Sequence, residues 1–344
     1  MNIFNEKTTM AKEKNIKSLE NIKRIAVFTS GGDAPGMNAA IRAVVRTATY
    51  HDLHVFGVER GYQGMIDGKI RRLETSDVGN IIQRGGTILR TARSKEFMTP
   101  EGRKKAYETL LANDIDACVA IGGNGTFTGA SIFQQEYDIP FIGLPGTIDN
   151  DLYGTDLTIG FDTAINTAME AADKIRDTAD SHDRLFFIEV MGRHAGFIAL
   201  HSAIGSGAGG VLIPENNQNL DDLILRLKKS EKRGKKFGLI VVAEGNKYGG
   251  AAAVAQIVKE QVSGYDTKIA VIGHLQRGGS PTCIDRVLAS RLGYEAVEAL
   301  IKGTSGVMVG MLNNQISFTT FEDAITKEKK INRDLMRMAE ILAL

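Results

Sequence analysis

Two aspartates, Asp149 and Asp151, stand two residues apart in the segment GLPGTIDND at residues 143–151, just past an apolar run. Carboxylates this close repel each other, so the pair indicates a metal ion, a phosphate group or a transferred proton as its partner. Thr147 can donate a hydrogen bond to a phosphate or a hydroxyl. Asp149 can accept a proton from a hydroxyl if nearby cations keep it ionised. The alternative is an Asx turn that caps the next segment, for which one aspartate would be enough.

Glycine-rich turns follow two other apolar runs, in SGGDAPG at 30–36 and GGNGTFTGA at 122–130. Glycine lets the backbone approach an anion, and the start of the helical pattern after each turn favours negative charge. Neither turn is a GxGxxG or Walker sequence, so each one alone is also compatible with an ordinary capped turn. Two such turns, with hydroxyls at Thr126 and Thr128, predict a phosphate site.

Basic side chains lie in three further loops. Arg90 and Arg93 follow the glycine pair at 85–86, where arginine suits bidentate phosphate binding, although a solvated basic turn is as good an interpretation. Arg193 ends the segment EVMGR, and His274 and Arg277 stand three apart in GHLQRGGSP. With the phosphate turns, these cations suggest two phosphorylated ligands on either side of Asp149, an arrangement that phosphoryl transfer needs.

Predicted strands and predicted helices alternate along the chain, and these elements must position the residues named above. Short apolar runs rich in valine and isoleucine predict buried parallel strands at 24–30, 116–123, 139–145, 185–190, 237–244 and 268–274. Amphipathic patterns predict helices at 36–50, 101–112, 126–136, 162–179, 194–204, 219–231, 249–262 and 283–302. This alternation predicts an α/β fold with helices on both sheet faces and ligands past the carboxyl ends of the strands.

The composition of the chain limits the classes of function that the protein could have. The 344 residues carry a net charge of +1, so no global field indicates nucleic acid or a membrane surface as a partner. The two cysteines, Cys118 and Cys283, lie far apart, which predicts free thiols in a reducing, cytoplasmic compartment. No apolar run is long enough to cross a membrane, and the polar, lysine-rich residues 1–21 predict a flexible N-terminal extension and not a signal peptide.

From about Ile25 almost to the C-terminus, the chain resembles the bacterial ATP-dependent 6-phosphofructokinases. The resemblance is carried, in order, by TSGGDAPGMNAAIR, IGLPGTIDND, TIGFDTA, SHDR, EVMGRHAG and GHLQRGGSP. It implies two similar Rossmann-like three-layer domains with mostly parallel sheets and the active site in the cleft between them. The expected bounds are 22–160 with 276–325 for the nucleotide-binding domain and 161–275 with 326–344 for the sugar-phosphate domain.

The activity that this resemblance implies is the committed step of glycolysis. The γ-phosphoryl of ATP passes to the C1 hydroxyl of fructose 6-phosphate, with Mg²⁺ as cofactor and a homotetramer as the assembly. Asp149 is then the proton acceptor, and Thr147 and Arg193 act on the transferred group. The residues implied to bind fructose 6-phosphate are Thr147, Asp149, Arg184, Met191, Gly192, Arg193, Glu244, Lys268, His274 and Arg277. Those implied to bind ATP are Gly31, Arg93, Ser94, Gly123, Asn124, Gly125 and Thr126.

Some positions depart from the pattern of the family. Asn124, an implied metal ligand with Asp151, stands where the family has an aspartate, and Lys268 where it has an arginine. Ser94 stands where an aromatic residue often lies against the adenine. Pyrophosphate-using relatives usually carry aspartate and lysine at the positions of Gly125 and Gly146, so glycine at both favours ATP. The alternatives are a weakly active or regulatory subunit of a hetero-oligomer, and a pyrophosphate-dependent enzyme.

The resemblance also implies effector control by ADP or phosphoenolpyruvate. Arg42 and Arg46 are four residues apart and therefore share one face of the helix predicted there. The residues implied to bind the effector phosphates are Arg42, Arg46, Arg176, Arg233 and Lys235. Without the resemblance, these side chains would be interpreted as solvent-exposed surface residues.

Overall fold

The computed structural model describes residues 22–216, 219–234 and 238–343. The chain forms two compact units. Unit 1 comprises the described part of Met1–Thr147 with Leu152–Gly160 and Ser280–Glu328. Unit 2 comprises the described parts of Ile148–Asp151, Phe161–Gly279 and Lys329–Leu344.

Unit 1 is built on a seven-stranded sheet whose central strands are parallel. In spatial order the strands are β11 (Gln315–Thr320), β10 (Val307–Leu312), β5 (Phe141–Pro145), β4 (Ala117–Gly122), β1 (Arg24–Thr29), β2 (His54–Val58) and β3 (Ile70–Leu73). Every residue of β4 and β5 is buried, as continuous apolar runs predict. Only the outer pairs, β2 with β3 and β10 with β11, are antiparallel.

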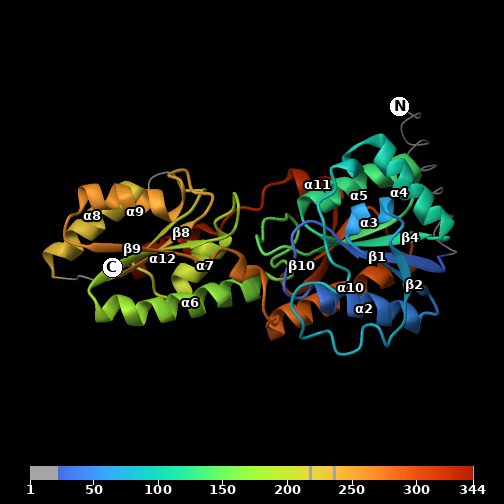
Figure 1. Ribbon diagram of the computed structural model, residues 1–344, viewed down its shortest axis with the longest axis horizontal. Helices are drawn as coiled ribbons and strands as arrows, with labels where there is room; N and C mark the ends of the chain where they lie inside the picture. Colours follow the sequence, from blue (N-terminus) through green and yellow to red (C-terminus); the bar gives the residue numbers. More distant parts are fainter. Residues whose placement is uncertain (1–21, 217–218, 235–237, 344) are drawn as a thin grey trace. The chain divides into compact units, whose positions relative to one another are not determined.

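Helices cover both faces of this sheet (Figure 1). On one face lie α2 (Met37–Tyr50) and α10 (Cys283–Ile301), and on the other α3 (Gly61–Ile66), α4 (Pro100–Ala112), α5 (Asn124–Tyr137) and α11 (Phe321–Thr326). The chain runs from β1 outward to β2 and β3, then returns to β4 and continues outward on the other side. The strand order therefore reverses between β1 and β4, and such a reversal opens a crevice at the carboxyl ends of the two strands.

Unit 2 has a smaller, wholly parallel sheet in the order β7 (Gly210–Leu212), β8 (Gly238–Ala243), β6 (Arg184–Val190) and β9 (Asp266–Val271). The helices α8 (Asn219–Lys232) and α9 (Gly250–Gln261) lie on one face, and α6 (Phe161–Ser181) and α7 (Phe197–Gly205) on the other (Figure 1). The short turn η2 (Gly273–Arg277) follows β9, and α12 (Arg333–Leu342) is the last helix that the structure describes.

The α/β class with mostly parallel sheets is confirmed, and the six predicted strands and eight predicted helices are present. The predicted burial was wrong for β9, because this strand lies at the edge of its sheet and has no buried residue. One strand end was wrong: the run predicted at 268–274 ends as a strand at Val271, and a 3₁₀ turn begins at Gly273. Gly273 has φ +53°, a left-handed conformation that leaves the extended path. The predicted extension at 1–21 lies outside the described residues. Within the described ranges, no helix is long and apolar enough to span a membrane.

Candidate active site

Two of the predicted phosphate turns meet at the reversal between β1 and β4. The backbone N–H of Ser30 donates to the carbonyl of Ile121 at 3.0 Å, and the Thr126 hydroxyl donates to the carbonyl of Ser30 at 3.1 Å. Gly31 has φ +88°, and a Cβ there would lie 3.7 Å from the Thr126 hydroxyl oxygen. The third turn joins them, because Thr91 donates to the carbonyl of Gly31 at 2.9 Å. These contacts bring the loops that carry Gly31, Arg93 and Thr126 to one edge of the sheet.

The helix α5 starts at this edge with its amide groups toward the turn. Gly123 is the N-cap, and no side chain caps this end of the helix. An uncapped helix start presents backbone N–H groups and a partial positive charge, which suit a phosphate. Thr147 lies alongside, since a Cβ on Gly123 would be 3.6 Å from the Thr147 Cβ. Asn124 and Gly125 form the first turn of α5, and an added Cβ on Gly125 would meet nothing within 4 Å.

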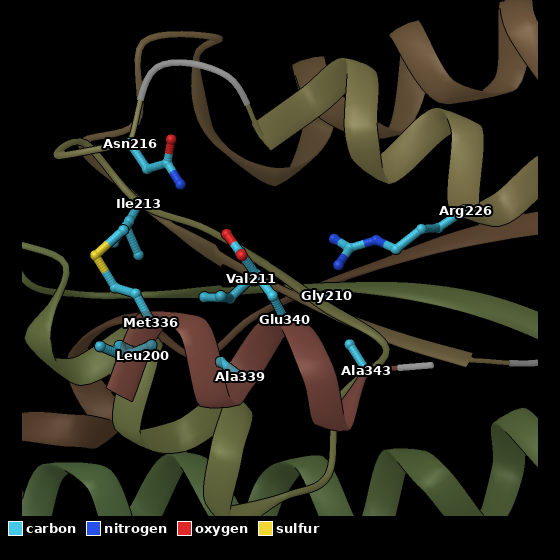
Figure 2. Close-up of a pocket in the computed structure, with 10 residues that line it drawn as sticks. All are labelled: Leu200, Gly210, Val211, Ile213, Asn216, Arg226, Met336, Ala339, Glu340 and Ala343. Carbon is cyan, nitrogen blue, oxygen red and sulfur yellow. The ribbon is translucent and has the colours of Figure 1, made fainter. Parts of the chain in front are cut away.

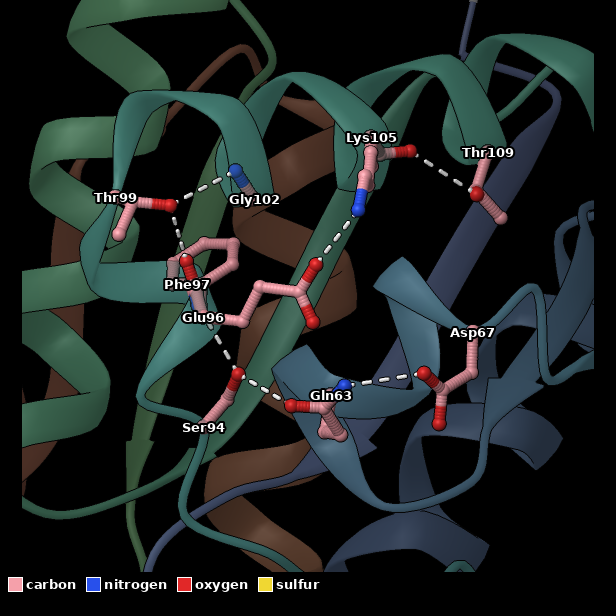
Figure 3. A network of polar contacts seen from close by, with 9 residues as sticks. All are labelled: Gln63, Asp67, Ser94, Glu96, Phe97, Thr99, Gly102, Lys105 and Thr109. Atoms are coloured by element: carbon pink, nitrogen blue, oxygen red, sulfur yellow. Dashed lines mark hydrogen bonds and ion pairs between the residues drawn. The ribbon is translucent and has the colours of Figure 1, made fainter.

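The loop that carries exposed Arg93 is fastened by its neighbour Ser94 (Figure 3). The Ser94 hydroxyl donates to the Gln63 side-chain carbonyl at 2.7 Å and accepts from the backbone N–H of Phe97 at 3.1 Å. Gln63 in turn donates to Asp67 at 3.0 Å. Ser94 is therefore tied to α3, where it holds the end of the loop in place.

The Asp149 carboxylate lies in a small cluster of charges within unit 2. Asp149 is only 2% exposed. Its oxygens lie 3.5 Å from Arg193 Nε and 4.0 Å from Arg277 Nη2. Burial raises the pKa of Asp149, and the negative charge of Asp151 raises it further, while Arg193 and Arg277 oppose the shift. A buried carboxylate between two guanidinium groups can be ionised and take up a proton from a bound hydroxyl.

Glu244 orients the backbone that carries Arg193. Its carboxylate accepts hydrogen bonds from the amide of Arg193 at 2.8 Å and from that of Gly192 at 3.3 Å. Arg193 has φ +52°, an uncommon conformation for a residue with a side chain. Met191 is held one step earlier, because its amide donates to the Gln276 side chain at 2.8 Å. The strand-end residues Met191, Gly192 and Arg193 are thus fixed by side chains from two other loops.

The other predicted sugar-phosphate residues lie apart from this cluster or at its edge. Arg184 and Lys268 both bind Asp266, at 3.2 and 2.9 Å. They lie near the starts of β6 and β9, whereas Arg193 follows the end of β6. With about 3.3 Å per residue, the seven residues of β6 separate the two places by roughly 20 Å. His274 is exposed and lies in η2, three residues before Arg277.

Three positioning residues were not identified from the sequence. Gln276 is completely buried and bridges Met191 to the carbonyl of Ala164. Lys329 donates to the Asn150 side chain at 2.8 Å, next to Asp149. Asn38 donates to the carbonyls of residues 84 and 85 and accepts from the amide of Ile88 at 2.8 Å, which fixes the loop before Arg93. Two of them stand in segments already singled out, Gln276 beside Arg277 and Asn38 in the run TSGGDAPGMNAAIR.

The predicted effector residues are distributed over both units. Arg42 and Arg46 lie on α2, and burial together with the charge of Arg46 lowers the pKa of Arg42. Arg176 on α6 donates to the carbonyls of Ser206 and Gly207. Arg233 is exposed just after α8, and Lys235 lies outside the described residues.

Comparison with known proteins shows the family to which the chain belongs. Residues 24–300 match the family described as Phosphofructokinase. The chain is 57% identical over 323 residues, 94% of its length and 100% of the relative's, to the ATP-dependent 6-phosphofructokinase 1 of Thermus thermophilus. It is 55% identical to the ATP-dependent 6-phosphofructokinase of Cytophaga hutchinsonii, over 93% of this chain and 98% of that one.

Solved structures agree with the sequence comparison. The phosphofructokinase of Saccharomyces cerevisiae matches with a TM-score of 0.85 and 36% identity over 93% of this chain. This chain spans about half of the yeast chain, 48%. A pyrophosphate-dependent phosphofructokinase from Marinobacter aquaeolei matches with a TM-score of 0.79 and 27% identity over 91% of this chain and 86% of that one. On its sequence and its fold, the chain belongs to the phosphofructokinase family.

Proposed function

We propose that the protein transfers the γ-phosphoryl group of ATP to the C1 hydroxyl of fructose 6-phosphate, giving fructose 1,6-bisphosphate and ADP. The observation that carries this proposal is Asp149, buried between Arg193 and Arg277 and two residues after Thr147. Thr147 lies against the phosphate turn at Gly123. Base and phosphate turn are thus joined by one short segment of chain, as phosphoryl transfer needs.

In this mechanism the C1 oxygen forms a bond to the γ-phosphorus while the bond from that phosphorus to the bridging oxygen of ADP breaks. Asp149 takes the C1 proton. Arg193 and the Thr147 hydroxyl stabilise the charge on the transferred phosphoryl group. The sugar phosphate is bound by Met191, Gly192, Glu244, His274 and Arg277. Glu244 also positions Arg193, because its carboxylate accepts a hydrogen bond from the backbone amide of that residue. The turns at Gly31 and Gly123–Thr126, with Arg93 and Ser94, bind ATP.

Packing around Gly146 supports ATP over pyrophosphate as the donor. A Cβ on Gly146 would lie 2.9 Å from a methyl carbon of Ile121 and 3.0 Å from the Met37 methyl, closer than ordinary contact. A lysine, which pyrophosphate-using relatives usually carry here, would not fit without displacing these side chains. The names of the closely similar bacterial relatives also specify ATP.

Mg²⁺ fits the residues that this chain offers. Within the described residues, no group of three or more His, Cys, Asp and Glu side chains could hold a metal ion. Mg²⁺ usually binds through one or two carboxylates together with the phosphates of the substrate, so no protein cage is needed. The ligands that we propose for it are Asn124 and Asp151, and the metal would neutralise charge on the ATP phosphates.

Asn124→Asp is expected to lower the Mg²⁺ concentration that gives half the maximal rate. Asparagine supplies a neutral oxygen where a hard cation prefers an anionic one. A magnesium titration at fixed ATP, comparing the wild type with Asn124→Asp, measures the effect, and Asn80→Asp on the surface serves as the control. If Asn124→Asp needs the same Mg²⁺ concentration or more, the missing charge at residue 124 does not limit Mg²⁺ binding.

The exposed edge strand β9 supports the proposed subunit arrangement. This strand is an edge of the sheet and leaves Ile269 47% and Val271 63% exposed. An open edge with exposed apolar side chains is suited to pairing with another chain. We place Arg184 and Lys268 at this interface, where they reach the 6-phosphate of a neighbouring subunit's substrate in a homotetramer.

Dissociation to monomers is therefore expected to abolish fructose 6-phosphate binding while ATP binding survives. Sedimentation and equilibrium binding across a dilution series measure both properties. A monomer that binds fructose 6-phosphate as tightly as the assembly would contradict the shared site.

The rate is expected to depend on the raised pKa of Asp149. A base acts only when ionised, so the rate falls as the pH falls through that pKa, at a higher pH than an ordinary aspartate would give. The acid limb of kcat/KM at saturating Mg²⁺ should therefore lie above the pH that an ordinary aspartate would give. An acid limb at or below the ordinary range of an aspartate would contradict a raised pKa for the base.

ADP or phosphoenolpyruvate are the proposed effectors, bound by Arg42, Arg46, Arg176, Arg233 and Lys235. The support is the pair on α2, where burial and, after it, the positive charge of Arg46 lower the pKa of Arg42. Two neighbouring guanidinium groups suit a phosphate.

A coupled assay of the purified chain with fructose 6-phosphate and ATP, GTP or pyrophosphate tests the function. ATP should give the highest kcat/KM. A higher kcat/KM with pyrophosphate would mean that pyrophosphate, and not ATP, is the phosphoryl donor. A chain that binds both substrates without turnover would favour a regulatory subunit.

A further inference from the structure

The hollow between β7, α7 and α12 in unit 2 is too small to bind a substrate or a cofactor (Figure 2). Leu200, Val211 and Met336 are among the residues that line it, and it has room for about one water molecule. The polar contacts of unit 2 that bear on the proposed reaction lie instead at the end of β6, just before the segment Met191–Arg193.

Glu189 places a half-buried carboxylate in a strand that is otherwise apolar after Arg184. The rest of β6 reads LFFIEV, and a strand inside a parallel sheet normally carries an aliphatic residue at such a position. Side chains alternate between the two faces of a strand, so Glu189 shares a face with Phe187. Phe187 belongs to the same core cluster as Val254 of α9. Glu189 therefore lies on the face of the sheet that α9 covers, at the carboxyl end of β6.

The Glu189 carboxylate holds the start of α9. Its Oε2 atom accepts a hydrogen bond from the backbone N–H of Ala251 at 2.7 Å. The N-cap residue of this helix, Gly249, has no side chain to offer, so Glu189 satisfies one of the N–H groups that a helix start leaves without an internal partner. A carboxylate suits this place because a helix start carries a partial positive charge. Gly250 permits the close approach, since a Cβ there would lie 2.6 Å from the same carboxylate oxygen.

The loop that joins β8 to α9 is thereby fixed at both ends. It begins with Glu244, and its first half is a tight turn in which the Asn246 side chain donates to the carbonyl of Ala243 at 2.8 Å. Its far end runs into α9, which Glu189 holds. Glu244 keeps its 2.8 Å hydrogen bond to the amide of Arg193 only while this loop stays in place.

The main chain of Glu189 holds a second loop. Its carbonyl oxygen accepts a hydrogen bond from the amide of Ile272 at 3.0 Å. Ile272 is the N-cap of η2, the turn that carries Gln276 and Arg277. Through its carboxylate and its carbonyl, Glu189 is bonded to both of the loops that hold Met191–Arg193 in position.

We propose, on the basis of the function proposed above, that Glu189 is a positioning residue for phosphoryl transfer. Its carboxylate fixes the start of α9 and the loop before it, so that Glu244 stays on the amide of Arg193, the residue placed on the transferred phosphoryl group. Glu189 acts through Glu244 and does not itself contact a substrate.

Glu189→Val is the central variant, because valine is a strand-forming residue that cannot accept a hydrogen bond. It should fold with an unfolding temperature near that of the wild type, while kcat/KM for fructose 6-phosphate falls by about tenfold or more. The KM for ATP should stay within about twofold, because the phosphate turns belong to unit 1. Glu189→Ala removes the same acceptor and serves as a second variant for every measurement.

Two further variants control for the loss of the side chain and of its charge. Glu189→Gln keeps an oxygen that can accept from Ala251, so it should retain most of the wild-type kcat/KM. Glu260→Ala, an exposed change near the other end of α9, should leave kcat/KM and the KM for ATP unchanged.

A double-mutant cycle separates positioning from a general loss of structure. If Glu189 acts through Glu244, adding Glu189→Val to a Glu244→Ala enzyme should change kcat/KM by less than about twofold, whereas independent effects would multiply.

Hydrogen exchange of the full chain, followed by mass spectrometry, provides a readout that needs no activity. Peptides that cover residues 244–251 should exchange about tenfold or more faster in Glu189→Val than in the wild type, and Glu189→Gln should resemble the wild type. A wild-type chain without kinase activity would refute the proposed function, and the exchange rates would still decide whether Glu189 holds this loop.

The proposal is overturned if folded Glu189→Val or Glu189→Ala keeps the wild-type kcat/KM for fructose 6-phosphate, or keeps the wild-type exchange at 244–251. An effect that multiplies fully with that of Glu244→Ala would also overturn it, because Glu189 would then not act through Glu244. The same holds if Glu189→Gln loses as much kcat/KM as Glu189→Val, since the hydrogen bond to Ala251 would then not be the contact that matters.

Discussion

Asp149→Asn is expected to lower turnover with fructose 6-phosphate by about 10²–10⁴-fold. Asparagine keeps the shape of the side chain but cannot accept the C1 proton. Asp149 is 2% exposed and lies 3.5 Å from Arg193, the residue that we place on the transferred phosphoryl group. Steady-state kinetics at saturating ATP measure the loss.

The affinity for fructose 6-phosphate should change little, because the sugar phosphate is bound mainly by other residues. Asp180→Asn, an exposed change on α6, is the matched control and should keep full turnover. An Asp149→Asn enzyme that keeps most of its turnover would remove Asp149 from the role of base.

Gly245→Ala is expected to lower kcat/KM for fructose 6-phosphate by about 10²-fold, since misplacing a catalytic group by about 1 Å can cost this much. A Cβ on Gly245 would overlap the carbonyl oxygen of Arg193 and lie 3.3 Å from the Cα of His194. The backbone of Arg193 would have to move, together with its hydrogen bond to Glu244. ATP binding should be preserved, because the phosphate turns belong to unit 1.

Gly209→Ala is the control, because a Cβ there comes no closer than 3.7 Å to the carbonyl oxygen of Leu239. Circular dichroism and thermal unfolding establish that both variants fold. A folded Gly245→Ala enzyme with wild-type kinetics would show that the position of Arg193 is not critical.

The long, strongly patterned elements could be predicted from the sequence. The run RIAVFTS became β1, and the amphipathic stretch at 283–302 became α10. Short or irregular elements could not. β7 has three residues, and β3 reads IRRL, with two exposed arginines, so neither has the apolar run of a buried strand. α12 was not predicted either, although its sequence RDLMRMAEIL is amphipathic, and only Ala339 of it is buried in the structure.

Some residues of the site could likewise be predicted from the sequence, and others could not. The loops at Gly31, Gly123 and Asp149 could be predicted because glycines and charges at strand ends form a local pattern. The bond from Gln276 to Met191 spans 85 residues, and that from Lys329 to Asn150 spans 179. A lone glutamine or lysine carries no local sign of such a partner, since the partner is set by how the chain folds. The left-handed backbone of Arg193 likewise depends on Glu244, which is 51 residues away.

The central claim is that this chain phosphorylates the C1 hydroxyl of fructose 6-phosphate from ATP with Asp149 as the base. Phosphorus NMR of the purified chain with ATP, Mg²⁺ and fructose 6-phosphate tests it most directly, because it identifies both products and the carbon that receives the phosphoryl group. The predicted result is ADP and a new C1 phosphate in equal amounts, formed far more slowly by Asp149→Asn. Phosphate on another carbon, release of inorganic phosphate without sugar phosphorylation, or equal rates for the two enzymes would contradict the account.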